Sequence, residues 1–172
     1  MKWVLVVLIG LALTAALVAV IGARLPKTHV ASRQAHFAAP PDTLWRLLTD
    51  IEAFPSWRGD LKSVHRLPDR QGLAVWVEEG KFGKMTFSIE RADAPRLLVS
   101  RVADADQQFG GTWTYELAPA AGGSTLTITE NGEIYNPLFR FMARFVFGYE
   151  ATMASYLKAL DAKISRTRTA AL

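Results

Sequence analysis

The first apolar segment of the chain runs from Trp3 to Ala23 and contains no charged residue. At about 1.5 Å of rise per residue, a helix of this length reaches roughly 30 Å, the thickness of the hydrocarbon core of a bilayer. The pattern therefore predicts a transmembrane helix over residues 1–24, followed by a short basic linker over residues 25–31.

A cleaved signal peptide is the competing interpretation of the same segment, with Lys2 as its positive end and Ala23 as the last residue before cleavage. The apolar stretch is longer than the usual signal-peptide core of about 7 to 15 residues, and Ile21 is a poor fit where a small side chain is needed. We therefore expect an uncleaved single-pass N-terminal anchor. The numbers of positive charges on the two sides of this segment are nearly equal, and the small difference slightly favours a cytoplasmic location of the folded domain.

Period-two alternation of apolar and polar residues dominates the middle of the chain, and turn residues interrupt it. The predicted order is one strand, two short helices, six further strands and a long final helix. The short gaps between the later strands favour hairpins and hence an antiparallel sheet. The predicted strands are residues 30–38, 61–67, 74–79, 85–91, 97–102, 112–117 and 125–134, and the two short helices are residues 43–49 and a piece that starts at residue 50 and breaks at Pro55.

The apolar period changes to 3.6 in the last part of the chain, which predicts one long helix from Asn136 to Ile164. Asn136 provides an N-cap side chain and Pro137 a favourable first helical residue. Its regular apolar stripe is Leu138, Met142, Phe145, Tyr149, Met153, Tyr156, Leu160 and Ile164. Four further apolar residues widen this stripe near its start and are expected to face a cavity mouth or a bilayer: Phe139, Phe141, Val146 and Phe147.

Length and composition indicate one folded domain, which we place at residues 32–165, with a basic tail at residues 166–172. The chain of 172 residues has no cysteine, which excludes disulfides, thiolate nucleophiles and cysteine-ligated metals. Its formal charge of +4 comes from the two ends of the chain, so the folded part is nearly neutral. A nucleic-acid surface normally concentrates basic residues on one face, so we expect no nucleic-acid partner.

Three motifs in the folded part resemble the START-like, polyketide cyclase/dehydrase superfamily (SRPBCC). They are Ala39-Pro-Pro-Asp42 leading into Leu44-Trp-Arg-Leu-Leu48, the turn Phe54-Pro-Ser-Trp57, and Gly111-x-Trp113-x-Tyr115-x-Leu117. The resemblance implies an α+β helix-grip fold, in which a curved antiparallel sheet wraps around the C-terminal helix and leaves a deep apolar cavity. Members of the superfamily bind or carry lipids, sterols, quinones and polyketides, and a minority catalyse cyclisation or dehydration. The superfamily has no shared catalytic motif, so the resemblance assigns no catalytic residue.

Candidate ligand-binding residues are those that the pattern places on the inner face of the sheet or on the facing side of the final helix. Aromatic rings and adaptable methionine side chains suit an apolar ligand, and a tyrosine hydroxyl can bind its polar end. Plain core packing is the alternative for each of them. The candidates are Trp76, Phe87, Trp113, Tyr115, Glu130, Met142, Phe145, Tyr149 and Met153.

Glu130 is the one charged residue among these candidates. By alternation it shares a face with Leu126 and Ile128, where an ionised carboxylate is costly to bury without a partner. It is either a polar anchor or acid/base group inside the cavity, or a structural residue: a glutamate at the rim, or one in an ion pair, for instance with Arg101.

Metal and cofactor sites have no support in the sequence. His29, His36 and His65 show no metal-ligand spacing, and there is no Gly-x-Ser-x-Gly motif. We expect neither a metal nor a cofactor, and we assign no catalytic residue.

Together these patterns favour a membrane-anchored binding protein for a hydrophobic small molecule such as a lipid, a quinone or a polyketide-like compound. One alternative is a cyclase- or dehydratase-type enzyme in the same cavity, with Glu130 or Tyr149 as acid/base. Another is a protein-interaction module that uses the exposed aromatic residues of the segment 139–147.

Overall fold

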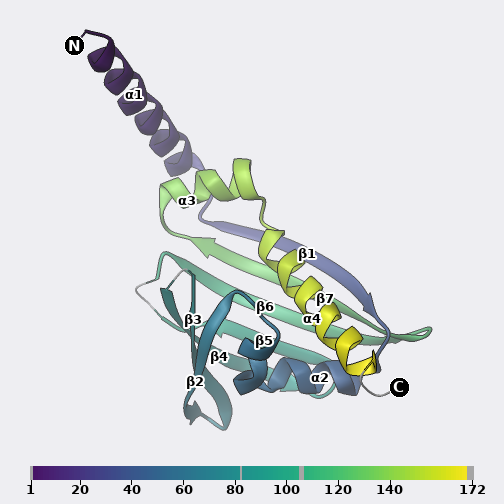
Figure 1. Cartoon of the computed structure of the whole chain (residues 1–172). Helices are drawn as coiled ribbons and strands as arrows, with labels where there is room; N and C mark the ends of the chain where they lie inside the picture. Colours follow the sequence, from purple (N-terminus) through teal and green to yellow (C-terminus); the bar gives the residue numbers. More distant parts are fainter. Residues whose placement is uncertain (1, 82, 105–106, 170–172) are drawn as a thin grey trace.

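The computed structural model of the chain describes residues 2–81, 83–104 and 107–169. It consists of an N-terminal helix, one seven-stranded sheet and the helices that accompany the sheet (Figure 1). The strands are β1 (Thr28–Phe37), β2 (Leu61–Arg70), β3 (Leu73–Gly80), β4 (Gly83–Asp93), β5 (Leu97–Val102), β6 (Phe109–Ala120) and β7 (Gly123–Ile134). The helical elements are α1 (Lys2–Arg24), α2 (Pro41–Thr49), the 3₁₀ segment η1 (Ile51–Ser56), α3 (Pro137–Met142), the π-helical segment η2 (Ala143–Phe147) and α4 (Ala151–Thr169).

The sheet is antiparallel throughout, with the strand order β1-β7-β6-β5-β4-β3-β2. Strands β2 to β7 follow one another as hairpins, and β1 pairs with the last strand, so the predicted meander is confirmed. A register shift between Ile89 and Arg91 interrupts the β4–β5 pairing, and such bulges bend a strand and increase its twist. The first strand begins at Thr28, inside the segment that the sequence assigned to a linker.

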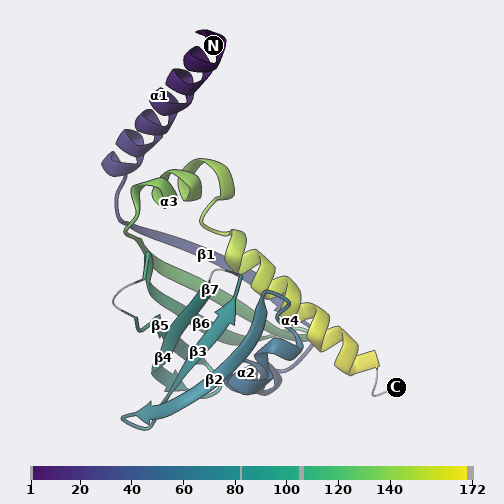
Figure 2. The same ribbon diagram turned by 60° about the vertical axis from the view of Figure 1, so that its left-hand side comes forward.

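The hydrophobic core lies between the inner face of the sheet and the helices α2 and α4. Leu126 and Ile128 of β7 are fully buried, as are Leu44 of α2 and both Met153 and Leu160 of α4. These residues belong to one continuous cluster, so α4 covers the sheet as the helix-grip resemblance implies. Figure 2 shows the sheet curving around this side of the molecule.

Helix α1 projects away from the sheet in both ribbon views (Figures 1 and 2). It is 23 residues long, and its side chains are exposed almost throughout. Its length and apolar composition are sufficient to span a bilayer, and a signal sequence near the N-terminus would share both properties.

The long final helix is the predicted element that the structure changes most, and its last part also continues to Thr169, beyond the predicted end at Ile164. The segment from Asn136 is not a single helix, because α3 and η2 end before Gly148 and α4 begins only at Ala151. Gly148 has φ 75° and ψ 156°, a backbone conformation that is open almost only to glycine. The apolar stripe is therefore divided: its residues from Met153 onward cover the sheet, whereas Met142 and Phe145 lie on a separate segment.

The predicted start of this segment is correct. The Asn136 side chain accepts hydrogen bonds from the backbone N–H groups of Leu138 and Phe139, at 2.9 and 3.4 Å, and Pro137 occupies the first helical turn. The capping residues thus define the beginning of α3, and Gly148 follows the last residue of η2.

Candidate functional site

An enclosure of aromatic side chains lies between α4 and the inner face of the sheet, centred on Tyr156. The Tyr156 ring meets Trp57 at 5.3 Å, Trp113 at 5.7 Å and Tyr115 at 6.0 Å between centroids. The Trp76 ring stacks on Phe87 at 5.6 Å and meets Phe54 edge-on at 6.4 Å. We call this set the aromatic enclosure; its members are Phe54, Trp57, Trp76, Phe87, Trp113, Tyr115 and Tyr156.

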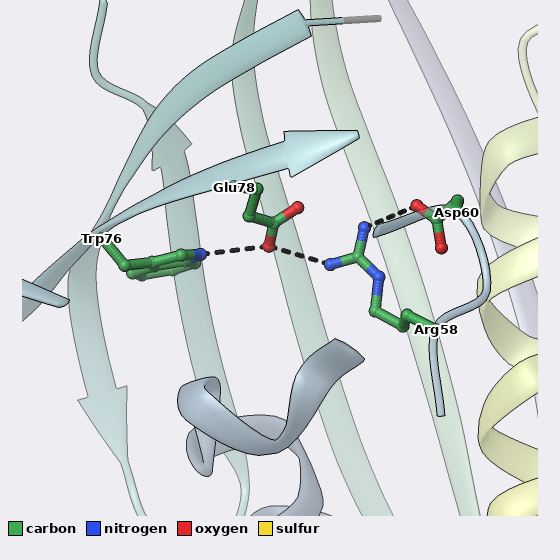
Figure 3. Close-up of polar contacts among 4 residues, drawn as sticks. All are labelled: Arg58, Asp60, Trp76 and Glu78. Carbon is green, nitrogen blue, oxygen red and sulfur yellow. Dashed lines mark hydrogen bonds and ion pairs between the residues drawn. The ribbon is translucent and has the colours of Figure 1, made fainter. Parts of the chain in front are cut away.

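A buried ion pair lies against the aromatic enclosure. Nη1 of Arg58 donates to Oε1 of Glu78 at 2.8 Å, and the same oxygen accepts from Nε1 of Trp76 at 3.0 Å (Figure 3). Nη2 of Arg58 donates to Oδ2 of Asp60 at 2.9 Å. The guanidinium also lies over the rings of Phe54 and Tyr156, at 5.6 and 5.3 Å from their centroids. Cation–π contacts thus stabilise the buried Arg58 guanidinium in addition to its ion pairs.

Local chain geometry explains how these charged groups reach the interior. Glu78 shares a strand face with Trp76, because side chains two positions apart in a strand point the same way. Arg58 follows η1, which ends at Ser56 after the proline at position 55. Burial alone lowers the pKa of Arg58, but the charges of Glu78 and Asp60 outweigh it and raise the pKa above its ordinary value. The guanidinium is therefore a permanent cation.

Two buried N–H donors at this site have no acceptor among the residues that the structure describes. They are Nε1 of Trp57 and Nε of Arg58. Trp57 is only 5% exposed, and the Arg58 side chain 14%. Leaving a buried donor unpaired costs about 1–3 kcal/mol, so an oxygen atom of a bound molecule would stabilise either group.

Two tyrosine hydroxyls complete the polar part of the enclosure. Burial raises the pKa of Tyr115 to about 12, and burial together with the neighbouring Tyr115 raises the pKa of Tyr156 well above its ordinary value. Both hydroxyls therefore keep their protons at neutral pH, where they can donate to an acceptor.

A second group of polar side chains lies near the start of α4. His29 stacks on Tyr149 with 4.0 Å between ring centroids, and its Nε2 is 3.7 Å from Oε1 of Glu130. Gly132 provides the space for the histidine, since a Cβ at this position would lie 2.3 Å from Cε1 of His29. The proposed Glu130–Arg101 pair is wrong, because Arg101 bonds to Glu90 instead.

The predicted ligand-binding residues thus separate into three groups. One group belongs to the hydrophobic core or packs directly against it, and it lies around the enclosure: Trp76, Phe87, Trp113, Tyr115 and Met153. Glu130 and Tyr149 belong to the second polar group. Met142 and Phe145 lie on α3 and η2, before the break at Gly148, and Phe145 is exposed.

Sequence reasoning missed the two charged residues at the enclosure. Glu78 was detectable, because it has the same alternation parity as Trp76, the argument already applied to Glu130. Arg58 lies in an irregular turn, where periodicity says nothing about direction.

Two shallow hollows in the described parts of the chain lie away from the enclosure. One is beside α1, and the other lies on the outer face of the sheet, where polar side chains such as Gln34, Glu116 and Thr127 line it. The space between α4 and the sheet is occupied by the aromatic rings themselves. Within the same described ranges, no cluster of histidine and acidic side chains has the arrangement of a metal site.

Solved structures share this fold, a curved antiparallel sheet covered by a C-terminal helix, which is the START-like helix-grip fold. A START superfamily protein from Mycobacterium smegmatis superposes with a TM-score of 0.64 at 16% identity, over 81% of this chain and 99% of that one. The Zhui aromatase/cyclase from Streptomyces sp. R1128 gives 0.65 at 15% identity, over 81% and 94%. The di-domain ARO/CYC StfQ of the steffimycin biosynthetic pathway gives 0.66 at 11% identity, over 83% of this chain and 52% of that one.

The family follows from the sequence profile described as "Polyketide cyclase / dehydrase and lipid transport", which matches residues 28–166. The chain belongs to this family. Membership indicates a ligand-binding or cyclase/dehydrase-type protein. A comparison with curated proteins gave no match.

Proposed function

We propose that the protein is a membrane-anchored binding protein for one hydrophobic small molecule that carries an oxygen acceptor, held beneath α4 at the aromatic enclosure. The observation that supports the proposal most directly is that two donors buried beside apolar rings, Trp57 Nε1 and Arg58 Nε, have no acceptor among the described residues. A binding site for an apolar ligand typically combines such rings with a few fixed polar groups.

Each part of the enclosure has a distinct role in this proposal. The ring faces of Trp76, Phe87 and Trp113 bury the apolar body of the ligand. The indole N–H of Trp57 and the guanidinium of Arg58 bind its oxygen atom. Because the rings contact one another in the present structure, the ligand replaces some of these ring–ring contacts and α4 moves away from the sheet.

The predicted membrane anchor is a second, independent argument for the same proposal. Helix α1 has the length and composition of a membrane span, and hydrophobic molecules such as lipids and quinones are concentrated in membranes. An anchored domain would meet its ligand where that ligand is most abundant.

The test starts with the full-length protein purified from membranes in detergent. Organic extraction followed by mass spectrometry should recover an apolar, oxygen-containing compound bound one to one. Rebinding of this compound is then measured with Trp57→Phe, which keeps an aromatic ring but loses the N–H donor. We expect affinity to fall about tenfold, the equivalent of one hydrogen bond.

Trp45→Phe is the matched control, because Trp45 packs against the same core from α2 and is not a member of the enclosure. Equal affinities for the two variants would contradict the proposed role of Trp57. Failure to recover any stoichiometric compound would contradict binding itself.

A cyclase- or dehydratase-type enzyme at the same site is the second candidate, favoured by one observation. The Arg58 cation lies over the Tyr156 ring, which in turn meets the Tyr115 ring, and the protonated hydroxyls of the two tyrosines beside this charge could donate to a carbonyl or hydroxyl oxygen. Incubating the recovered compound with the protein distinguishes the two candidates. A binding protein returns the compound unchanged, whereas a dehydratase returns a product that is lighter by one water.

A further inference from the structure

The part of the chain that connects β7 to α4, made of α3 and η2, has an unusual concentration of exposed apolar side chains. Among the described residues outside α1, most exposed large apolar side chains belong to it, with Val30, Leu67 and Tyr135 as the others. We call this set the α3–η2 surface; it consists of Leu138, Phe139, Phe145, Val146 and Phe147. An apolar patch of this kind on a folded domain usually marks a contact with a partner or with lipid.

The end of α1 holds this segment in place through the backbone. A Cβ at Gly22 would lie 2.0 Å from the carbonyl oxygen of Pro137, so the two chains can approach this closely only at a glycine. Nη1 of Arg140 donates to the carbonyl oxygen of Leu25 at 2.7 Å. In both ribbon views α3 lies across the foot of α1, between α1 and the sheet (Figures 1 and 2).

These contacts set the depth of the segment relative to α1. Gly22 precedes Arg24, the first charged residue after the apolar stretch, by two positions, or about 3 Å along a helix axis. If α1 spans a bilayer, Pro137 therefore lies near the boundary between hydrocarbon and headgroups. The exposed residues that follow it lie at the same boundary.

The charges around the segment suit this boundary as well. Arg24, Lys27 and Arg144 are exposed, and no acidic residue occurs between Pro137 and Gly148. A short segment with bulky apolar residues and basic neighbours is the usual composition of a helix that lies in the headgroup region of an anionic membrane.

We propose that the α3–η2 surface inserts into the bilayer leaflet in which α1 ends, as a second membrane contact that holds the domain at a fixed orientation. The proposal rests on the proposed anchoring by α1, because the depth of the segment is derived from that helix. Gly148 then marks the point at which the chain leaves the membrane and returns to the sheet as α4.

Site-directed spin labelling tests the proposal in the full chain, which has no cysteine of its own. Phe147→Cys and Phe145→Cys place labels on the α3–η2 surface. Leu13→Cys, within α1, is the control for the bilayer interior, and Leu67→Cys, on β2, is the control for water. The labelled proteins are reconstituted into vesicles of mixed phosphatidylcholine and phosphatidylglycerol, and the accessibility of each label to oxygen and to a water-soluble nickel chelate is compared.

We expect the oxygen-to-nickel ratio at Phe147 and Phe145 to be several-fold higher than at Leu67 and lower than at Leu13, as for side chains at the boundary between hydrocarbon and headgroups. A ratio equal to that at Leu67 would overturn the proposal. If Leu13 nevertheless reports the bilayer interior, the anchoring by α1 stands, so the two failures are distinguishable. Dipolar broadening at Phe147 without an increased oxygen ratio would show that a second copy of the chain covers the surface, and this result also overturns the proposal.

Discussion

Arg58 carries a permanent positive charge inside a largely apolar enclosure; Glu78 is its buried partner, and Asp60 pairs with it from a half-exposed position. The Glu78 side chain is 8% exposed, and one of its oxygens accepts from both Arg58 and Trp76. Removing the buried partner of an ion pair is costly, because the remaining charge has lost its compensation in the interior, and only the half-exposed Asp60 would then pair with Arg58.

Glu78→Gln should therefore lower the free energy of unfolding by about 3 kcal/mol, because the amide retains hydrogen-bonding capacity but no charge. Denaturant unfolding of the full chain in detergent measures this change. Glu79→Gln is the control on the neighbouring position, where the carboxylate pairs with Lys84 at 3.7 Å near the surface. The free energy of unfolding of this control should stay within about 0.5 kcal/mol of the wild type. Equal losses of unfolding free energy in both variants would show that the buried Arg58–Glu78 pair stabilises the fold no more than a surface pair does.

At this scale, alternation along the strands predicted side-chain direction well. Trp76, Trp113 and Tyr115 face the interior as expected, since a strand fixes the direction of every second side chain. The partner of Glu130 could not be predicted, because it depends on which strand lies beside which, and on the pairing of β1 with β7 that brings His29 close. Arg58 lies outside any periodic element, so only the folded structure reveals its burial.

At the scale of elements, Gly148 separates the aromatic segment from the helix that covers the sheet. Its φ of 75° with ψ of 156° belongs to a region that a residue with a Cβ adopts only at a cost of about 1–3 kcal/mol. Gly148→Ala should lower the free energy of unfolding by that amount, as measured by thermal or denaturant unfolding.

Gly59→Ala is the matched control for this change. A Cβ at either glycine meets no atom within 4 Å, so the two substitutions differ in backbone conformation and not in packing. If Gly148→Ala were as mild as Gly59→Ala, the chain around residue 148 would be able to continue as a helix, and the break would not depend on the glycine.

The missed break also shows what helical periodicity cannot detect. Apolar residues continue at intervals of three and four from Leu138 to Ile164, so the pattern alone predicts one helix. A glycine within such a pattern is often tolerated at a cost of about 1 kcal/mol. The decisive factor here is tertiary, because α3 contacts α1 whereas α4 packs on the sheet, and one straight helix cannot make both contacts.

At the scale of the whole molecule, the order of elements predicted an antiparallel sheet covered by the last helix, and the family resemblance implied the helix-grip fold. Short hairpin connections require an antiparallel meander, and a sheet with one apolar face needs a covering helix, which only the last element is long enough to provide. The aromatic rings that fill the space under α4 were not predictable in the same way, because side-chain packing depends on distances that no periodicity encodes.

The central claim is that a hydrophobic ligand with an oxygen acceptor binds at the unpartnered donors of the enclosure. The most direct measurement is the indole N–H spectrum of the full-length protein labelled with ¹⁵N-tryptophan, recorded without and with the compound recovered by extraction. The chain has five tryptophans, and the signal of Trp57 is assigned as the one that disappears in Trp57→Phe. The account predicts a saturable downfield shift of the Trp57 indole proton as it gains an acceptor, with the Trp3 signal unchanged. A saturable shift of other indole signals while Trp57 stays in place would contradict it.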